Sequence, residues 1–144
     1  MKLLTVKELQ AKIAEAEGAK ASAALRAMHA EEEEKRALLE RLTRPSGLSD
    51  DEVMEKASII INRAVENGQM SVQVFRFPHS LCSDDGRAIN QAESGWEGTL
   101  TGIPKEIYEF WKRQLQPRGY HIRYETINYP GGMPGDIGII LSWG

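Results

Sequence analysis

The segment from Arg76 to Arg87 holds the densest group of side chains that could do chemistry. It contains an imidazole, the only thiol of the chain, two carboxylates and two guanidinium groups. It is expected to follow a strand and precede a helix, a junction where α/β folds often place ligand sites. We take it as the candidate ligand-binding loop, with these candidate residues: Arg76, His79, Cys82, Asp84, Asp85 and Arg87.

Cys82 could act as a nucleophile in this loop. Arginine and histidine side chains nearby in sequence would lower the pKa of its thiol, whereas Asp84 and Asp85 would oppose a thiolate. The alternative is that Cys82 is a small apolar side chain packed in the core, which is the commoner fate of a lone cysteine.

The carboxylates of the loop could instead bind a metal ion together with His79, and Asp136 is a further candidate contributor. Oxygen-rich clusters suit magnesium or manganese, and an imidazole favours a transition metal. The spacing matches no established ligand motif, however. Acidic residues are also favoured in the first turn of a helix, which explains Asp84 and Asp85 without a metal.

An anion is the third candidate ligand. Free backbone N–H groups at the start of the helix near Arg87, together with Arg76, could hold a phosphate or a carboxylate. Alternatively, Arg87 pairs with Asp84 or Asp85 and stiffens the loop. Because each kind of chemistry has a sufficient structural alternative, we predict no metal and no cofactor, and we leave the catalytic residues unknown.

Two further features have simple structural interpretations. The glycine-rich stretch from Pro130 to Gly138 lacks the phosphate-loop pattern and is typical of a hairpin connection. Trp96 lies in a polar, glycine-rich stretch, where it either fills the edge of the core or anchors a partner. We favour the core and keep Trp96 as a candidate partner anchor.

Residues 5–43 have the composition of a helix. Thr5 and Glu8 form a capping-box pattern, and nine alanines occur between Ala11 and Ala30. Gly18 could split the segment, so it is either one long helix or a helical hairpin. Charged residues interrupt the apolar heptads, so a long coiled coil is not predicted. The alanine-rich faces nevertheless allow a close helix–helix contact.

The remainder predicts a compact α/β domain. Helices are expected at residues 49–67, 87–93 and 104–116, and strands at 70–77, 120–129 and 136–143. The helices at 49–67 and 104–116 each have an apolar face that we expect to be buried, formed in the first by Val53, Ala57, Ile60, Ile61, Ala64 and Val65. We expect the last two strands to pair antiparallel and the first two to be parallel through a right-handed crossover. The apolar run from Ile137 to Leu141 indicates that the last strand is central and buried on both faces.

The fold class that follows is α+β. It combines an N-terminal helical segment, a long helix or a helical hairpin, with a small mixed three-stranded sheet packed with two to three helices. We divide the chain into residues 1–45, a helical oligomerisation or interaction segment, and residues 46–144, a compact α/β domain.

The composition of the chain argues against several classes of protein. The net charge of −3 is spread over both halves, which argues against a dedicated nucleic-acid binder. A single cysteine excludes an internal disulfide. No apolar stretch suits a membrane helix or a secretory signal, so we expect a cytoplasmic protein without membrane contact.

No motif in the chain identifies a function. The preferred hypothesis is a non-catalytic interaction or regulatory protein that forms a homo-oligomer, or binds a protein partner, through residues 1–45. The alternative is a small enzyme acting on an anionic small molecule in the His79–Arg87 loop. That alternative requires the loop side chains to converge on one pocket, with Asp136 or Tyr129 beside them.

Overall fold

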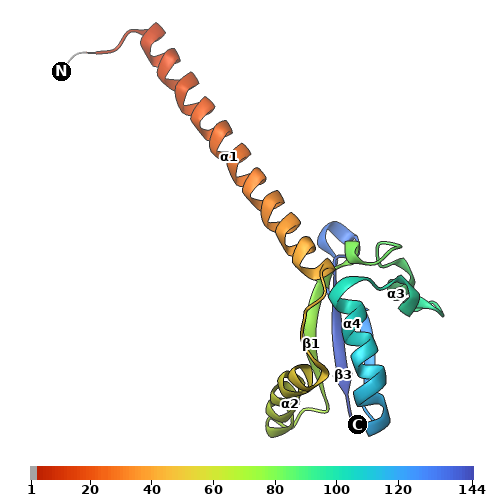
Figure 1. Ribbon diagram of the computed structural model, residues 1–144. Helices are drawn as coiled ribbons and strands as arrows, with labels where there is room; N and C mark the ends of the chain where they lie inside the picture. Colours follow the sequence, from red (N-terminus) through yellow and green to blue (C-terminus); the bar gives the residue numbers. More distant parts are fainter. Residues whose placement is uncertain (1–2) are drawn as a thin grey trace. The chain divides into compact units, whose positions relative to one another are not determined.

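The computed structural model describes residues 3–144, and the chain divides into two units (Figure 1). These are Met1–Leu38, which we call the N-terminal unit, and Leu39–Gly144, which we call the C-terminal unit. Within residues 3–144, no helix is both long enough and apolar enough to cross a membrane.

Helix α1 is a single uninterrupted α-helix, Val6–Thr43. Its start is capped reciprocally: the Glu8 amide donates to Thr5 Oγ1 at 3.2 Å, and the Thr5 amide donates to Glu8 Oε2 at 3.4 Å. This confirms the capping box. Gly18 does not split the helix, so the segment is the long helix and not the hairpin. No residue of α1 is buried.

The last turn of α1 belongs to the C-terminal unit, where Leu39 and Leu42 pack against the core. Gly102, at the start of α4, lies directly against the backbone of this turn. A β-carbon at Gly102 would collide with the carbonyl oxygen of Leu42, and its φ of +59° also favours glycine. The residues of α1 before Leu39 therefore contribute nothing to this core, and we call them the exposed part of α1.

The sheet has three strands: β1 (Ser71–Pro78), β2 (His121–Thr126) and β3 (Asp136–Ser142). Their order is β1-β3-β2, and β3 pairs antiparallel with both neighbours. The predicted α+β class and the predicted antiparallel pairing of the last two strands are confirmed. The sheet is antiparallel throughout and not mixed, because β3 inserts between β1 and β2.

Strand β3 is the centre of the core, as predicted from its apolar run. Its five middle residues are all buried, and the side chains of Ile137 and Ile139 are fully inaccessible. These two side chains and Leu141 lie on the face of the sheet that carries the helices. Ile140 points to the opposite face, where its register partners are the polar Gln73 and Arg123.

Three helices complete the C-terminal unit: α2 (Asp50–Glu66), α3 (Arg87–Asn90) and α4 (Gly102–Phe110). The predicted helix at 104–116 changes character after Phe110 and continues as a π-helical turn, Trp111–Leu115. The capping box that begins α2, from Ser49 to Glu52, is confirmed. Short 3-10 turns connect the other elements, at His79–Leu81, Trp96–Thr99, Gln116–Arg118 and Pro130–Gly132.

The apolar face predicted for α2 is only partly correct. Ile61 and Ala64 are buried against the sheet, but Val65 is 53% exposed and is not part of the buried face. Val53, Ala57 and Ile60 are only half-buried, although they lie on the predicted face. One flank of α2 is therefore apolar and incompletely covered.

Candidate functional site

The side chains of the predicted loop are engaged in local structure. Arg76 Nε donates to Asp136 Oδ2 at 2.7 Å, so the first and last strands are joined by an ion pair at the surface. His79 Nδ1 lies 3.1 Å from the carbonyl oxygen of Gly135, and it thereby ties the turn after β1 to the residues before β3. These contacts hold the end of β1 against the start of β3.

Cys82 is buried in the core, with 3% of its surface exposed. The pKa of its thiol is raised to about 11, chiefly by burial and to a smaller extent by the nearby Asp84 and Asp85 carboxylates. The thiol is therefore protonated at neutral pH, which is the opposite of what a nucleophilic cysteine requires.

Asp84 shapes the turn that leads into α3. Its two carboxylate oxygens accept hydrogen bonds from the backbone N–H groups of Gly86, at 3.0 Å, and Ala88, at 2.9 Å. The predicted pairing of Arg87 with Asp84 or Asp85 is wrong, because Arg87 lies nearest Glu93, at 3.7 Å. Asp84 thus occupies the amides that an anion would need.

The remaining candidates also have structural partners. Trp96 is half-buried against Tyr124 and Tyr108, with ring centroids 5.0 and 5.7 Å apart, so it fills the core edge. Tyr129 is exposed and donates to Asn90 Oδ1 at 3.1 Å. Among residues 3–144, no group of three or more His, Cys, Asp and Glu side chains is placed to hold a metal ion.

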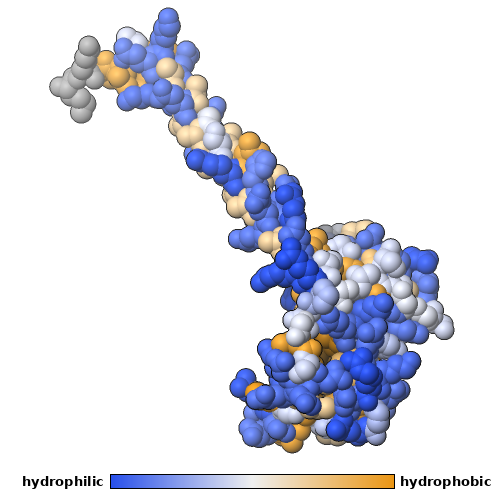
Figure 2. Space-filling model, in the orientation of Figure 1, coloured by the Kyte–Doolittle hydropathy of each residue, from blue (hydrophilic) through white to orange (hydrophobic). Residues whose placement is uncertain are grey.

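A different feature stands out in the C-terminal unit: an apolar groove between α2 and α4 with a volume of about 590 Å³. This volume is typical of sites that bind small molecules or side chains. Figure 2 shows orange side chains in a hollow beside α2. The apolar lining comes from α2, from strands β1 and β3, and from α4 with its π-helical turn: Val53, Ala57, Ile60, Val74, Phe75, Leu141, Ile103, Ile107, Phe110, Trp111 and Leu115.

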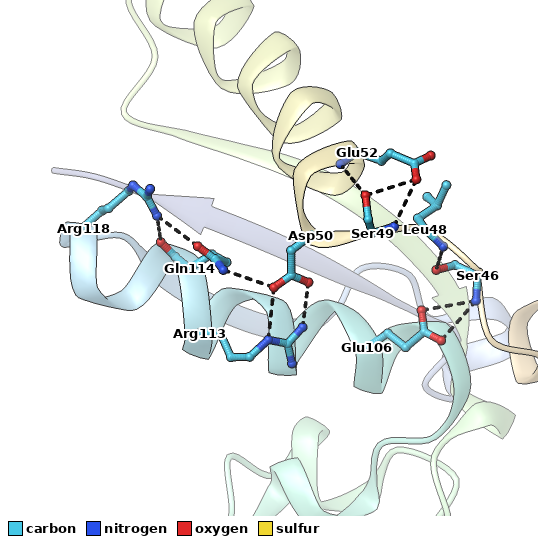
Figure 3. Close-up of polar contacts among 9 residues, drawn as sticks. All are labelled: Ser46, Leu48, Ser49, Asp50, Glu52, Glu106, Arg113, Gln114 and Arg118. Carbon is cyan, nitrogen blue, oxygen red and sulfur yellow. Dashed lines mark hydrogen bonds and ion pairs between the residues drawn. The ribbon is translucent and has the colours of Figure 1, made fainter.

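Polar contacts fix the two walls of this groove relative to each other (Figure 3). Arg113 donates to Asp50 through Nη2 at 2.9 Å and Nε at 3.3 Å, and Gln114 donates to the same carboxylate at 3.1 Å. These hydrogen bonds, that of Arg113 first, lower the pKa of Asp50 below its ordinary value. The Ser46 amide donates to both Glu106 oxygens, at 3.1 and 3.3 Å.

The rim of the groove carries more acid than base. Three carboxylates, those of Asp50, Glu106 and Glu109, line it together with the cations of Lys56 and Arg113. Apart from this rim, the lining offers few polar groups that could orient a polar ligand. The arrangement suits apolar side chains surrounded by a mainly basic or neutral edge.

A second apolar surface lies in the N-terminal unit. Val6, Leu9 and Ile13 share one face of α1, since they are three and four residues apart, and their exposed fractions are 70%, 45% and 58%. Nothing among residues 3–144 covers them. Leu25 and Met28 are exposed to a similar extent further along the helix.

The groove was missed from the sequence, whereas the apolar faces that line it were predicted. Periodicity identified an apolar face on residues 49–67 and another on 104–116, and both were expected to be buried. It carries no information on how far apart two such faces lie after folding. The Asp50–Arg113 contact that bridges the two faces joins residues 63 positions apart.

Comparison with known protein families, with characterised proteins and with solved structures found no match to this chain.

Proposed function

We propose that this chain is a non-catalytic interaction protein that self-associates through the exposed part of α1. The observation that carries this proposal is the 38-residue helix without a single buried residue. An isolated helix gains no stability from tertiary packing, and Val6, Leu9 and Ile13 have the spacing by which helices dock into partners. Association would cover apolar surface that the single chain leaves in water.

The alternative, a small enzyme at the His79–Arg87 loop, has weaker support. Asp84 binds backbone amides, Arg76 pairs with Asp136, and the Cys82 thiol is buried and protonated. None of the six loop candidates lines the groove between α2 and α4. A catalytic role would require several of these contacts to be exchanged for substrate contacts.

The test is the mass of the protein in solution, measured by light scattering over a wide range of concentration. The full chain should be a dimer or larger, and a variant lacking residues 1–37 should be a monomer. The deletion ends before Leu39 because Leu39 and Leu42 pack against the core of the C-terminal unit. A full chain that stays monomeric throughout the range contradicts the proposal.

A full-length variant removes the concern that the deletion harms the fold. Ile13→Glu changes one exposed apolar side chain to a good helix former and should weaken association. Leu25→Glu is its matched control, since Leu25 is 56% exposed and Ile13 58% exposed, but Leu25 lies about a third of a turn away around the helix. Equal weakening by both variants argues against a specific docking face.

A further inference from the structure

Two apolar surfaces of this protein have no cover among residues 3–144, and their shapes are complementary. One is convex, the face of α1 formed by Val6, Leu9 and Ile13. The other is concave, the groove between α2 and α4. Apolar anchors at positions i, i+3 and i+7 are the pattern by which an amphipathic helix occupies an apolar groove.

We propose that the first turns of α1 from one copy dock into the α2–α4 groove of a second copy. This inference rests on the proposed self-association and names the surface that receives the helix. A helix pairing with a groove joins two different surfaces, and two such contacts related by a two-fold axis make a closed, isologous interface. The smallest closed arrangement is a dimer in which each copy inserts its helix into the groove of the other.

Charge complementarity favours α1 of a second copy as the helix that occupies the groove. The rim of the groove has three carboxylates and two cations, whereas residues 6–13 contain Lys7 and Lys12 against Glu8 alone. Glu8 lies on the side of the helix away from the apolar face, and its carboxylate caps the Thr5 amide. Lys12 flanks the apolar face, whereas Lys7 and Glu8 both lie far from it around the helix. A cation is therefore the charge nearest to the acidic rim, which disfavours wrong partners and speeds the encounter.

The polar groups of the groove also favour apolar side chains over a polar small molecule. Asp50, Arg113 and Glu106 already bond within the chain. Of the charged rim residues, only Lys56 and Glu109 have no ion pair or side-chain hydrogen bond within the described part of the chain, and both are exposed. A polar ligand would find little to orient it, whereas valine, leucine and isoleucine side chains need no polar partner.

The test obstructs the groove without removing any core side chain. Ala57 lines the groove on α2, so Ala57→Glu places a long charged side chain across it while keeping a good helix former. Its matched control is Ser58→Glu, at the next, exposed position outside the lining. Ala57→Glu should raise the dissociation constant about tenfold or more, as Ile13→Glu should, whereas Ser58→Glu should leave it unchanged.

Mixing the two defective variants gives the decisive result. The Ala57→Glu copy keeps an intact helix, and the Ile13→Glu copy keeps an intact groove, so equal amounts should form a 1:1 heterodimer where each alone is monomeric. Thermal unfolding followed by circular dichroism checks that both variants are folded.

Other outcomes separate this inference from the proposed function. If Ile13→Glu disrupts the oligomer but Ala57→Glu does not, α1 pairs with α1, and the groove inference is overturned while self-association stands. If the full chain is monomeric, both fail. A monomer whose groove binds a hydrophobic dye would point to a small apolar ligand and would also overturn the inference.

Discussion

The exposed part of α1 and the C-terminal unit differ most in where their apolar side chains lie. In α1 no residue is buried, although the helix contains valine, leucine, isoleucine and methionine. In β3 five consecutive residues are buried, and two of them are fully inaccessible. The same residue types therefore stabilise the fold in one region and remain available for a partner in the other.

The difference shows what holds each region together. The C-terminal unit depends on burial, since its sheet and helices enclose a continuous apolar core. The exposed part of α1 depends on its alanine content and on a capping box at its start. A substitution should consequently have different effects in the two regions, even when the residues exchanged are the same.

The largest expected effect comes from isoleucine-to-alanine substitutions. Ile139→Ala should lower the free energy of unfolding by about 2–5 kcal/mol, because Ile139 is fully buried and a cavity would remain. Ile13→Ala should change it by less than about 0.5 kcal/mol. Urea unfolding followed by tryptophan fluorescence measures both, since all three tryptophans lie in the C-terminal unit.

Both variants should be compared at a concentration where their masses in solution are equal. Self-association would otherwise add a concentration-dependent term to stability. A loss for Ile13→Ala comparable with that for Ile139→Ala, under these conditions, would mean that α1 is packed against something within the single chain.

Glycine-to-alanine substitutions should have opposite signs in the two regions. Gly102→Ala should destabilise the protein by about 1–3 kcal/mol, because φ is positive and the β-carbon would collide with the last turn of α1. Gly18→Ala should stabilise α1 by about 0.5–1 kcal/mol, since no atom lies within 4 Å of the added carbon.

Far-UV circular dichroism during heating distinguishes these two outcomes. The Gly18 variant should retain more helical signal at each temperature, whereas the Gly102 variant should unfold at a lower temperature. Unchanged stability of the Gly102 variant would show that the α1–α4 contact gives way easily.

The same division explains what could be predicted from the sequence. The helical segment from Val6, the capping box at Ser49 and the central strand from Ile137 follow local rules of capping and periodicity, and the sequence predicted their positions to within a few residues. Whether the first segment is one helix or two was left open. The predicted parallel pairing of the first two strands was wrong, because β1 pairs with β3 and not with β2. That is a long-range choice, and a short connection between the last two strands does not determine it.

The candidate site was harder to predict for a physical reason. Cys82, Asp84 and Arg76 have the residue types of a catalytic site, but residue type does not reveal that Cys82 is buried or that Asp84 binds backbone amides. The groove, in contrast, is made of ordinary apolar residues. Only the distance between α2 and α4 distinguishes the groove from the buried core, and residue type does not reveal that distance.

Replacing the residues that cap the helices should change stability less, and the change should again differ between α1 and the C-terminal unit. Ser49→Ala removes the acceptor of the Glu52 amide and should lower the free energy of unfolding of the C-terminal unit by about 1 kcal/mol. Thr5→Ala removes the equivalent acceptor in α1 and should leave that unfolding unchanged, while amide hydrogen exchange near Glu8 becomes faster. Ser49→Asp should restore stability, because aspartate is an equally good cap; failure to restore it would assign another role to Ser49.

The smallest expected effect concerns the ion pair that joins the walls of the groove. The pKa of Asp50 is lowered in the fold, chiefly by its hydrogen bonds from Arg113, so its contribution to stability is present above the ordinary value of 3.8. It is lost as the pH falls through the lowered pKa of the folded state. Asp50→Asn should therefore be slightly less stable than the parent at neutral pH and equally stable in strong acid.

The comparison needs urea unfolding at several pH values, with Asp51→Asn as the control. Asp51 is exposed and makes no side-chain hydrogen bond within residues 3–144, so its variant should be as stable as the parent. Because Asp50 and Arg113 are exposed to solvent, the effect should be small and should shrink at high salt. A difference that persists unchanged in acid would show that Asp50 stabilises α2 by something other than its charge.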